Sequence, residues 1–386
     1  MLSSQMVPRL ACWTQRTLSH SLRFPSSSIS RKTFFVNCFN KEMGEDSNLL
    51  AKDRKRANFR LCNLSNYTSE ILEIQADAPS LHVLFVPGNP AIGQVSHSRK
   101  DLEHGKLFSL QEQIDHKIDF IKEELQDIKI PIILVGHSIG AYISIEMFKK
   151  SLEKVKYYIG LYPFLTLNPH STTQSIIGKI AQSQILAAAL SYLIASLGLL
   201  PVKALRFIVR KSLGKSWSSN AVEAACSHLS QYHTMRNVLY MAMTEFKKVY
   251  CFLSTNTPFR FTGSWEVGVL FLATYNLICI IPIQACPSKK TNVNFNLSAV
   301  LYHLELAETP DWAFLRERKD QCAFLFGVDD HWGPLQLHEE ISKQVPGIPL
   351  FIERENHTHG FCCTEAGSLW VAQHVANLIK NQVANQ

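Results

Sequence analysis

Charged side chains are scarce in this sequence, and their distribution excludes several classes of protein. Only 18% of the 386 residues are charged, whereas 46% are hydrophobic. A disordered chain has the opposite balance, so we expect most of this chain to fold around a core. The first 41 residues hold no acidic residue and most of the net positive charge, which leaves the remainder nearly neutral. A nearly neutral body has no basic surface for nucleic acid, so we expect no nucleic-acid partner.

The ten cysteines lack the paired C-x-x-C spacing of zinc sites. Cys362 and Cys363 are adjacent, which suits neither an ordinary disulfide nor a metal site. The His-x-His pair formed by His357 and His359 has no further ligands at metal-site spacing. Free thiols in a reducing compartment are the simplest interpretation. We therefore expect no metal and no cofactor.

Residues 1–41 also lack the continuous apolar stretch of a secretory signal. Their scattered arginines and frequent serines are typical of an organellar transit peptide. The alternatives are a disordered basic extension without a targeting role, or an upstream start in the gene model. We place residues 1–50 outside the folded domain, which we expect to span 51–380. A plastid or mitochondrial location is the localisation that such a segment implies.

The motif that organises the chain is Gly136-His137-Ser138-Ile139-Gly140, which follows a short β-branched apolar run and precedes a helical one. This order of strand, sharp turn and helix is the G-x-S-x-G nucleophile elbow of serine hydrolases. The turn aims the backbone N–H of Ile139 at the developing oxyanion. The alternative is a chance Gly-Ser turn in a βα unit. We expect His137 to pack against and orient its neighbours rather than act as the base.

A second loop upstream of the elbow, Pro87-Gly88-Asn89-Pro90, follows a buried-type strand at 81–86. In a hydrolase with this elbow, the loop after that strand supplies the second oxyanion donor. Pro90 has no N–H, so Asn89 is the candidate donor. An ordinary Pro-Gly turn is the alternative interpretation.

Candidates for the acid and the base follow two late strands, in the order that the elbow requires. Asp329 and Asp330 come after the strand at 322–327, and His357 and His359 come after the strand at 350–353. The carboxyl ends of parallel strands are where open α/β sheets place their sites. We favour Asp330 because it lies further out on its loop. We favour His359 because Gly360 and an apolar anchor follow it.

Strands and helices alternate along the chain, which predicts an α/β fold with a mostly parallel sheet flanked by helices. The predicted strands lie at 59–64, 70–74, 81–86, 132–135, 155–161, 322–327 and 350–353. The predicted helices lie at 111–125, 141–150, 231–248, 337–343 and 366–380.

One region of the chain lacks charge altogether. Residues 180–202 contain no charged side chain and consist largely of Leu, Ile and Ala. Their length would allow a transmembrane helix, but a glycine, a proline and several polar residues favour a shallower element. We expect residues 165–248 to form a hydrophobic helical cap, which either contacts a lipid interface or is buried without lipid contact. The composition changes again over residues 249–304, which we interpret as an insertion.

Four segments resemble the lipid droplet-associated hydrolase family of the α/β-hydrolase superfamily, in the manner of its plant members. They are Pro87-Gly88-Asn89-Pro90, the elbow pentapeptide, the Asp330…His359 tail and the run 107–117. The resemblance covers residues 80–93, 95–248 and 305–380. It implies an ester hydrolase acting on lipid or sterol esters at lipid droplets or the endoplasmic reticulum, with 180–202 in the droplet-binding region.

Two departures from the family pattern concern the length of the chain. The interval from Asn89 to Ser138 is short by one βα unit of about 30 residues, so we expect a missing strand and a gap in the sheet with unpaired backbone groups. Residues 249–304 interrupt a passage that is continuous in the family. Both departures are typical of a splice variant or a misassembled gene model. They lead to the hypothesis that this is a poorly active or inactive variant of a competent hydrolase.

Two further functions stay open at this point. One is a non-catalytic lipid-droplet or membrane-associated protein that keeps the α/β-hydrolase frame. The other is a thioesterase or acyltransferase with the same Ser-Asp-His triad. The acyl preference depends on the packing of the cap, and no protein partner is indicated.

Overall fold

The computed structural model describes ten stretches of the chain, which exclude the predicted insertion at 249–304 and most of residues 1–50. The stretches are 9–13, 58–64, 67–74, 76, 79–89, 105–125, 129–168, 170–213, 216–246 and 309–384.

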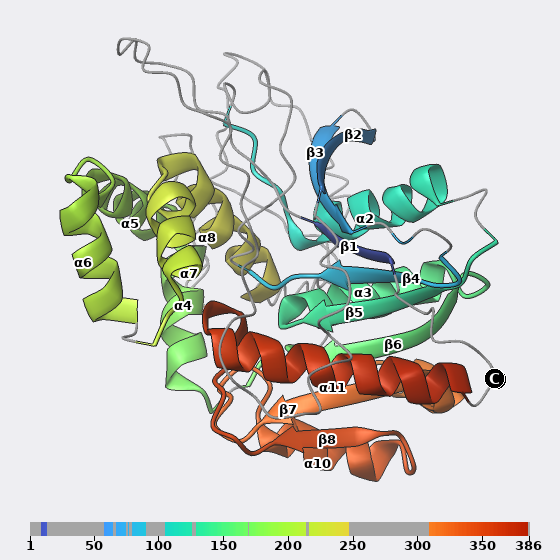
Figure 1. Cartoon of the computed structure of the whole chain (residues 1–386). Helices are drawn as coiled ribbons and strands as arrows, with labels where there is room; N and C mark the ends of the chain where they lie inside the picture. Colours follow the sequence, from blue (N-terminus) through green and yellow to red (C-terminus); the bar gives the residue numbers. More distant parts are fainter. Residues whose placement is uncertain are drawn as a thin grey trace, which may run out of the picture. The chain divides into compact units, whose positions relative to one another are not determined.

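Eight strands form one sheet in the order β2-β3-β1-β4-β5-β6-β7-β8 (Figure 1). The strands are β1 (Arg9–Trp13), β2 (Asn58–Leu64), β3 (Tyr67–Ile74), β4 (His82–Val86), β5 (Ile132–His137), β6 (Val155–Leu161), β7 (Cys322–Gly327) and β8 (Leu350–Glu353). The strands β2 and β3 pair antiparallel at one edge, β3 pairs antiparallel with β1, and each later pair is parallel. The predicted α/β class with a mostly parallel sheet is confirmed.

Strand β1 corrects two sequence-based expectations. We placed residues 1–50 outside the fold, yet Arg9–Trp13 lie inside the sheet, antiparallel to β3 and parallel to β4. We also expected a missing strand and a gap in the sheet, but the described strands form a continuous sheet in which β1 lies between β3 and β4. The ladder bonds that β3 and β4 require are made by backbone groups, so a short extended segment of transit-like composition can supply them. The expected gap therefore gives no reason to regard the chain as inactive.

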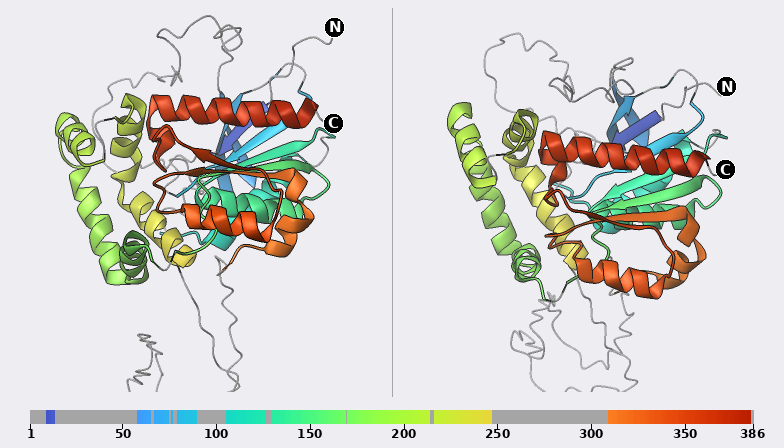
Figure 2. Two further views of the ribbon diagram at one scale, coloured as in Figure 1. Left: turned by 90° about the horizontal axis from the view of Figure 1, so that it is seen from below. Right: turned by 60° about the horizontal axis from the view of Figure 1, so that its bottom comes forward.

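The helices cover the two faces of the sheet unequally (Figure 2). One face carries α2 (Leu110–Glu124), α3 (Ile139–Lys150) and α10 (Leu335–Gln344), with the short α9 (Trp312–Glu317), whereas α11 (Glu365–Ala384) packs on the other. Strand β5 is buried on both sides: Leu134 belongs to the first core, and Val135 to the second. A strand that is buried on both faces is an unbroken run of apolar residues, which is why the sequence pattern predicted this strand.

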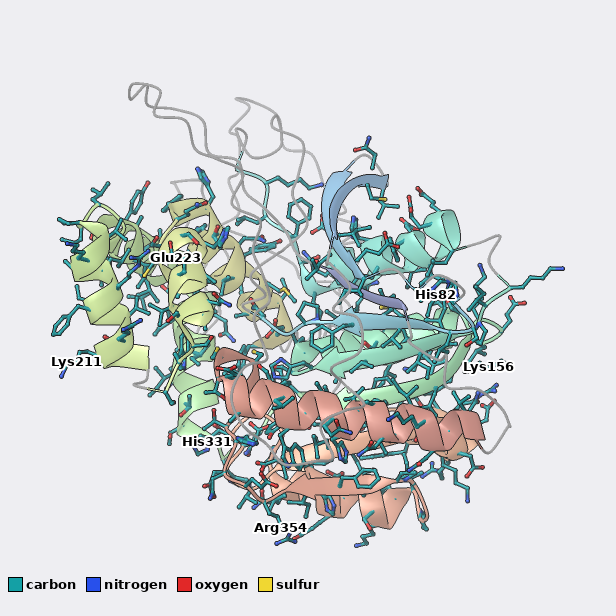
Figure 3. All side chains as sticks on the ribbon, in the orientation of Figure 1. His82, Lys156, Lys211, Glu223, His331 and Arg354 are labelled. Atoms are coloured by element: carbon teal, nitrogen blue, oxygen red, sulfur yellow. The ribbon has the colours of Figure 1, made fainter. Side chains whose placement is uncertain are left out.

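A separate group of helices lies within the segment that we predicted as a cap. It comprises α4 (Thr172–Gln182), α5 (Gln184–Leu197), α6 (Val202–Leu213), α7 (Ser219–Ala224), the π-helical turn η2 (Ala225–Leu229) and α8 (Tyr232–Phe246). Helices α4 and α5 pack against α8. Helix α6 is fastened to α7 by the Arg206 guanidinium, which donates two hydrogen bonds to the Glu223 carboxylate. Figure 3 shows Glu223 and Lys211 in this group, remote from β8.

Among the described residues, no single helix is both long and apolar enough to cross a bilayer. Helices α4 and α5 meet that criterion only together, and they are bent by 97° at the break between them.

Candidate active site

Ser138 lies between the end of β5 and the start of α3, in a backbone conformation that residues other than glycine rarely adopt. Its φ is 56° and its ψ is −127°. Hydrogen bonds on both sides hold this turn in place. The Ser138 N–H donates to Leu161 O over 3.1 Å, and Ser138 O accepts from the N–H groups of Ala141 and Phe164. Strand β6 and the loop that follows it therefore hold the turn that presents the serine.

Three glycines pack against this turn so closely that a side chain would not fit. A Cβ on Gly136 would lie 2.6 Å from Ala141 Cα, and one on Gly140 would overlap the carbonyl oxygens of Val86 and Pro87. A Cβ on Gly88 would lie 2.7 Å from Ser138 Cβ. The glycines of the elbow motif are therefore explained by steric contact with the backbone. Gly88 also brings the loop after β4 against the serine.

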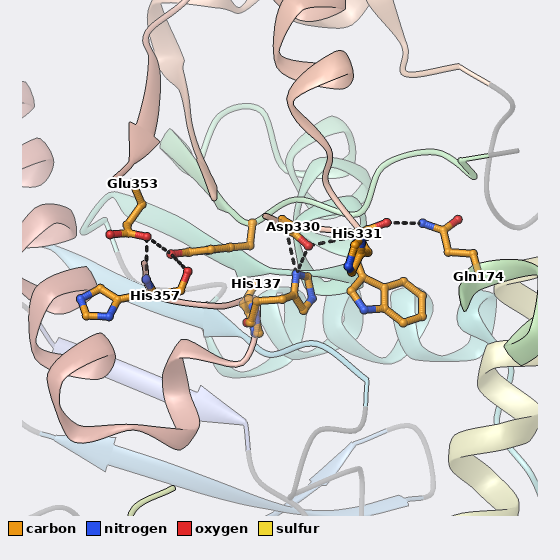
Figure 4. A network of polar contacts seen from close by, with 9 residues as sticks. His137, Gln174, Asp330, His331, Glu353 and His357 are labelled. Atoms are coloured by element: carbon orange, nitrogen blue, oxygen red, sulfur yellow. Dashed lines mark hydrogen bonds and ion pairs between the residues drawn. The ribbon is translucent and has the colours of Figure 1, made fainter. Parts of the chain in front are cut away.

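Asp330 and His359 form a hydrogen-bonded pair near the same edge of the sheet (Figure 4). His359 Nδ1 lies 2.9 Å from each carboxylate oxygen of Asp330. The carboxylate also accepts the Trp332 N–H over 2.9 Å, and it is buried. Since a carboxylate accepts, Nδ1 carries the proton and Nε2 of a neutral ring is left as the basic nitrogen.

The structure separates the two pairs of candidates that sequence reasoning left open. Asp329 is exposed, whereas Asp330 is buried against His359. The ring of His357 lies 6.0 Å from that of Trp370, away from Asp330. The backbone of His357 is fixed by its N–H, which donates to Glu353 Oε2 over 3.0 Å.

The serine and the imidazole are not hydrogen-bonded to each other. Within the described part of the chain, Ser138 Oγ makes no hydrogen bond to His359. The residue before the serine, His137, contacts His359, and the centroids of the two rings lie 5.0 Å apart. Catalytic hydrogen bonds are often long in an enzyme without substrate and tighten only when substrate is bound. The arrangement is therefore compatible with a serine, an imidazole and a carboxylate that act in sequence.

Two backbone N–H groups have no acceptor within the described residues, one next to Ser138 in sequence and one next to Gly88, which packs against Ser138. The N–H groups of Ile139 and Asn89 donate to no other group among the described residues. Ile139 begins α3, and Asn89 follows Gly88. The side chain of Asn89 points elsewhere, because its amide donates to Val238 O and to Glu245 on α8.

His137 occupies the space beside the pair, as we expected of an orienting residue. Its Nε2 lies 3.0 Å from His359 O, and its ring meets that of Phe361 edge-on with centroids 4.8 Å apart. Burial, followed by the proximity of His359, lowers the pKa of His137 to about 3. A neutral ring facing a carbonyl oxygen donates its Nε2–H there. His137 therefore holds the backbone of His359.

Sequence reasoning missed two side chains that shape these loops. Glu353 has 0% of its surface exposed, and it accepts hydrogen bonds from the N–H groups of Glu355 and His357 and from the Tyr162 hydroxyl. Burial and the neighbouring Glu353 raise the pKa of Tyr162. Gln174 of α4 donates to His331 O over 2.9 Å (Figure 4). A carboxylate at the end of a predicted strand was the only signal for Glu353, and Gln174 had none.

Comparison with known proteins finds a family whose profile matches this chain. The profile of the family described as lipid-droplet associated hydrolase matches residues 91–257 and 302–362, which is more than half of the chain. A protein of that name from Gallus gallus is 32% identical over 155 residues, covering 39% of this chain and 45% of the relative. The one from Mus musculus is 28% identical over 287 residues, covering 72% and 65%. The chain thus spans about half to two thirds of the length of these relatives.

Among solved structures, haloalkane dehalogenase DbeA from Bradyrhizobium elkani has a TM-score of 0.52 with this chain. The match covers 86% of this chain and 100% of the dehalogenase, at 12% sequence identity. At so low an identity the likeness concerns the fold alone, which is that of the α/β-hydrolases.

Proposed function

Because the chain belongs to the lipid droplet-associated hydrolase family, we propose that it is a serine ester hydrolase acting on lipid or sterol esters. Ser138 is the nucleophile, His359 the base and Asp330 the group that orients the base. The N–H groups of Ile139 and Asn89 form the oxyanion hole. The observation that carries the proposal is the 2.9 Å contact between His359 Nδ1 and Asp330, together with the strained turn at Ser138, whose neighbour His137 lies 3.0 Å from His359 O.

The first half of the proposed reaction transfers the acyl group to the enzyme. His359 Nε2 takes the proton from Ser138 Oγ as the oxygen attacks the ester carbonyl. The carbonyl oxygen becomes an oxyanion, which accepts hydrogen bonds from the N–H groups of Ile139 and Asn89. The intermediate collapses, the bond to the alcohol oxygen breaks, and that oxygen leaves with the proton from His359. Asp330 stabilises the imidazolium while it exists.

The second half releases the acid. Water loses a proton to His359 Nε2 and attacks the acyl carbonyl, and the same two N–H groups stabilise the second oxyanion. The bond to Ser138 Oγ breaks, the carboxylic acid leaves, and the proton returns to the serine. The ester and one water are the reactants, and the serine and the imidazole return to their starting protonation states.

A fluorophosphonate probe tests this proposal directly. We expect the purified chain to hydrolyse p-nitrophenyl esters and to lose that activity once it is labelled. Mass spectrometry of a digest should place the adduct on the peptide that contains Ser138. Cholesteryl ester, triacylglycerol and thioester donors, compared as substrates, distinguish the proposed activity from a thioesterase or an acyltransferase. A chain that neither hydrolyses esters nor takes up the probe would instead be a non-catalytic member of the family.

The cap supports the second part of the proposal, which is attachment to the surface of lipid droplets or of the endoplasmic reticulum. Large apolar side chains of the kind usually found in a protein core are exposed on α4–α6 and on the turns between them. They are Ile176, Ile185, Leu186, Tyr192, Leu193, Leu199, Leu200, Val202 and Phe207. We call this set the apolar cap face. Exposed apolar side chains gathered in one group of helices are typical of a membrane or partner surface, and an interfacial helix lies with its apolar face in the lipid boundary.

In this proposal, strand β1 and residues 51–380 form the hydrolase domain, with 165–248 as its lipid-binding cap and 249–304 as an insertion. The share of the family match within 165–248 supports the view that the cap is part of the family pattern.

Two acidic substitutions on the apolar cap face are expected to prevent attachment. In Ile185→Asp/Leu199→Asp, residues that are 81% and 88% exposed become charged. Burying one large aliphatic side chain contributes about 1.5–3 kcal/mol, so loss of two should lower partitioning onto droplets by about 100-fold or more. Flotation with artificial triacylglycerol droplets measures the bound fraction. Leu152→Asp, an exposed leucine after α3, is the control and should float normally. Equal flotation of the double variant and the control would contradict attachment through this face.

Substitution of His137 by phenylalanine is expected to slow the reaction about tenfold, since the variant loses one hydrogen bond worth about 1–1.5 kcal/mol. The aromatic packing against Phe361 is kept, but His359 O loses its donor. Steady-state hydrolysis of p-nitrophenyl butyrate measures the effect. The matched control is His357→Phe, which leaves the backbone bond from residue 357 to Glu353 in place. If both variants lose the same activity, the bond from His137 to His359 has no special role.

A further inference from the structure

The side chain of Asn89 is held by the cap, whereas the residue before it, Gly88, packs against Ser138. We propose that Glu245 of α8 positions the oxyanion loop by binding the Asn89 side-chain amide. Glu245 is a positioning residue here, because it acts on the reaction only through Asn89. The inference rests on the proposed function, since it concerns the donor that stabilises the oxyanion in that mechanism.

Two acceptors on α8 share the Asn89 amide nitrogen. Asn89 Nδ2 lies 3.1 Å from Val238 O and 3.2 Å from Glu245 Oε1. Both partners are acceptors, so the amide must present its NH₂ group to them and cannot be flipped. Its own oxygen, Oδ1, is buried with no hydrogen-bond partner among the described residues. The Asn89 side chain therefore has no other hydrogen-bond partner in the described part of the chain, and the two bonds to α8 fix its position.

Helix α8 is itself tied to the body of the hydrolase, so it can serve as a fixed reference. Thr244 Oγ1 accepts the N–H of Leu110 over 3.0 Å, at the start of α2. Asn237 Oδ1 accepts the N–H of Phe108 over 2.9 Å. The donors of both bonds lie at the N-terminal end of α2, and α2 packs on the sheet. The position of Asn89 is therefore set by the same helix that is anchored beside α2.

The bond matters because of what lies next to Asn89. Gly88 is in contact with Ser138, so a shift of this loop moves a backbone N–H relative to the nucleophile. An oxyanion donor must lie about 2.7–3.1 Å from the oxygen that develops charge. A displacement of about 1 Å can cost about 100-fold in rate. Glu245 is 4% exposed, so water does not readily replace its carboxylate as the acceptor.

Alanine variants separate the side chain of Asn89 from its backbone donor. Asn89→Ala keeps the N–H but loses both bonds to α8, and Glu245→Ala loses one of them. We expect kcat for p-nitrophenyl butyrate to fall about 10- to 100-fold in each variant. We expect KM to change little, because the oxyanion exists only in the transition state and the intermediates that resemble it. Glu245→Gln keeps an acceptor oxygen and should restore most of kcat.

The double variant Asn89→Ala/Glu245→Ala tests whether the two residues act as one unit. If they do, the double variant is no slower than the slower single variant. Gln182→Ala is the matched control, because Gln182 also bonds the end of α8, at Phe246 O, but does not contact Asn89. Its kcat should equal that of the unmodified chain. Melting temperatures of all variants show whether a loss comes from unfolding.

The outcomes of these experiments distinguish failure of the role of Glu245 from failure of the proposed hydrolase function. Unchanged kcat in Glu245→Ala and Asn89→Ala, a rise in KM alone, or losses that multiply in the double variant overturn this inference. If Glu245→Ala does not fold, Asn89→Ala and Glu245→Gln still decide the matter through kcat. If the unmodified chain takes up no fluorophosphonate, the proposed function fails, and this inference fails with it.

Discussion

Replacement of Ser138 by alanine is expected to lower kcat for ester hydrolysis by about a million-fold. The substitution removes the only atom that bonds to the acyl group and leaves both oxyanion donors in place. Alanine meets the same backbone strain at φ 56° as serine does, and the hydrogen bonds that hold the turn are made by backbone groups. The fold should therefore survive. Single-turnover hydrolysis measures the loss, and the fluorophosphonate adduct should disappear.

Ser151→Ala provides the control for this result. Ser151 is also buried, but it lies at the opposite end of α3, where its N–H donates to Phe148 O. We expect the control to label and to hydrolyse like the unmodified chain. Labelling that persists in Ser138→Ala would mean that another residue reacts with the probe, and the elbow would lose its proposed role.

Asp330→Asn is expected to lower kcat by about 10⁴-fold, the size of effect that follows when an imidazole is held in the wrong tautomer. Asparagine can still accept the Trp332 N–H through its oxygen. Its NH₂ group then faces His359 Nδ1 and donates to it, which moves the ring proton to Nε2. A protonated Nε2 cannot take the proton of Ser138. Steady-state kinetics on a soluble ester measures the loss.

Asp329→Asn is the matched control, because the same change is made one residue earlier on an exposed side chain. Its activity should be that of the unmodified chain. The reverse pattern, with loss in Asp329→Asn and none in Asp330→Asn, would show that the loop rearranges before catalysis. Equal losses would indicate that the two carboxylates share the role.

The parts of the fold that sequence could predict are those in which local pattern and topology agree. The elbow needs only a buried strand, a tight turn and a helix within one short stretch. The placement of Asp330 and His359 needed one further rule, namely that parallel strands end at the same edge. Both could be read without knowing any contact. The choice of Asp330 over Asp329 followed from distance along a loop, and the structure adds the burial and the bond to His359.

The parts that sequence could not predict depend on contacts between distant segments. Glu353, Gln174 and Glu245 are ordinary polar residues in helices or at a strand end, and only tertiary packing makes their partners visible. Strand β1 is the clearest case, because strand pairing is chosen by position in the sheet rather than by composition. Its side chains suggested a leader sequence, while its backbone belongs between β3 and β4.

The position of β1 in the sheet means that residues 9–13 cannot both be removed as part of an import signal and form a strand of the folded protein. A processing peptidase that removed the first 41 residues would also remove a strand from the interior of the sheet. Strands β3 and β4 would then stand two strand spacings apart, about 10 Å, each with an unpaired edge. Those edges would bind any extended segment that could reach them, including one from another molecule. A sheet that includes residues 9–13 and the removal of those residues are therefore mutually exclusive.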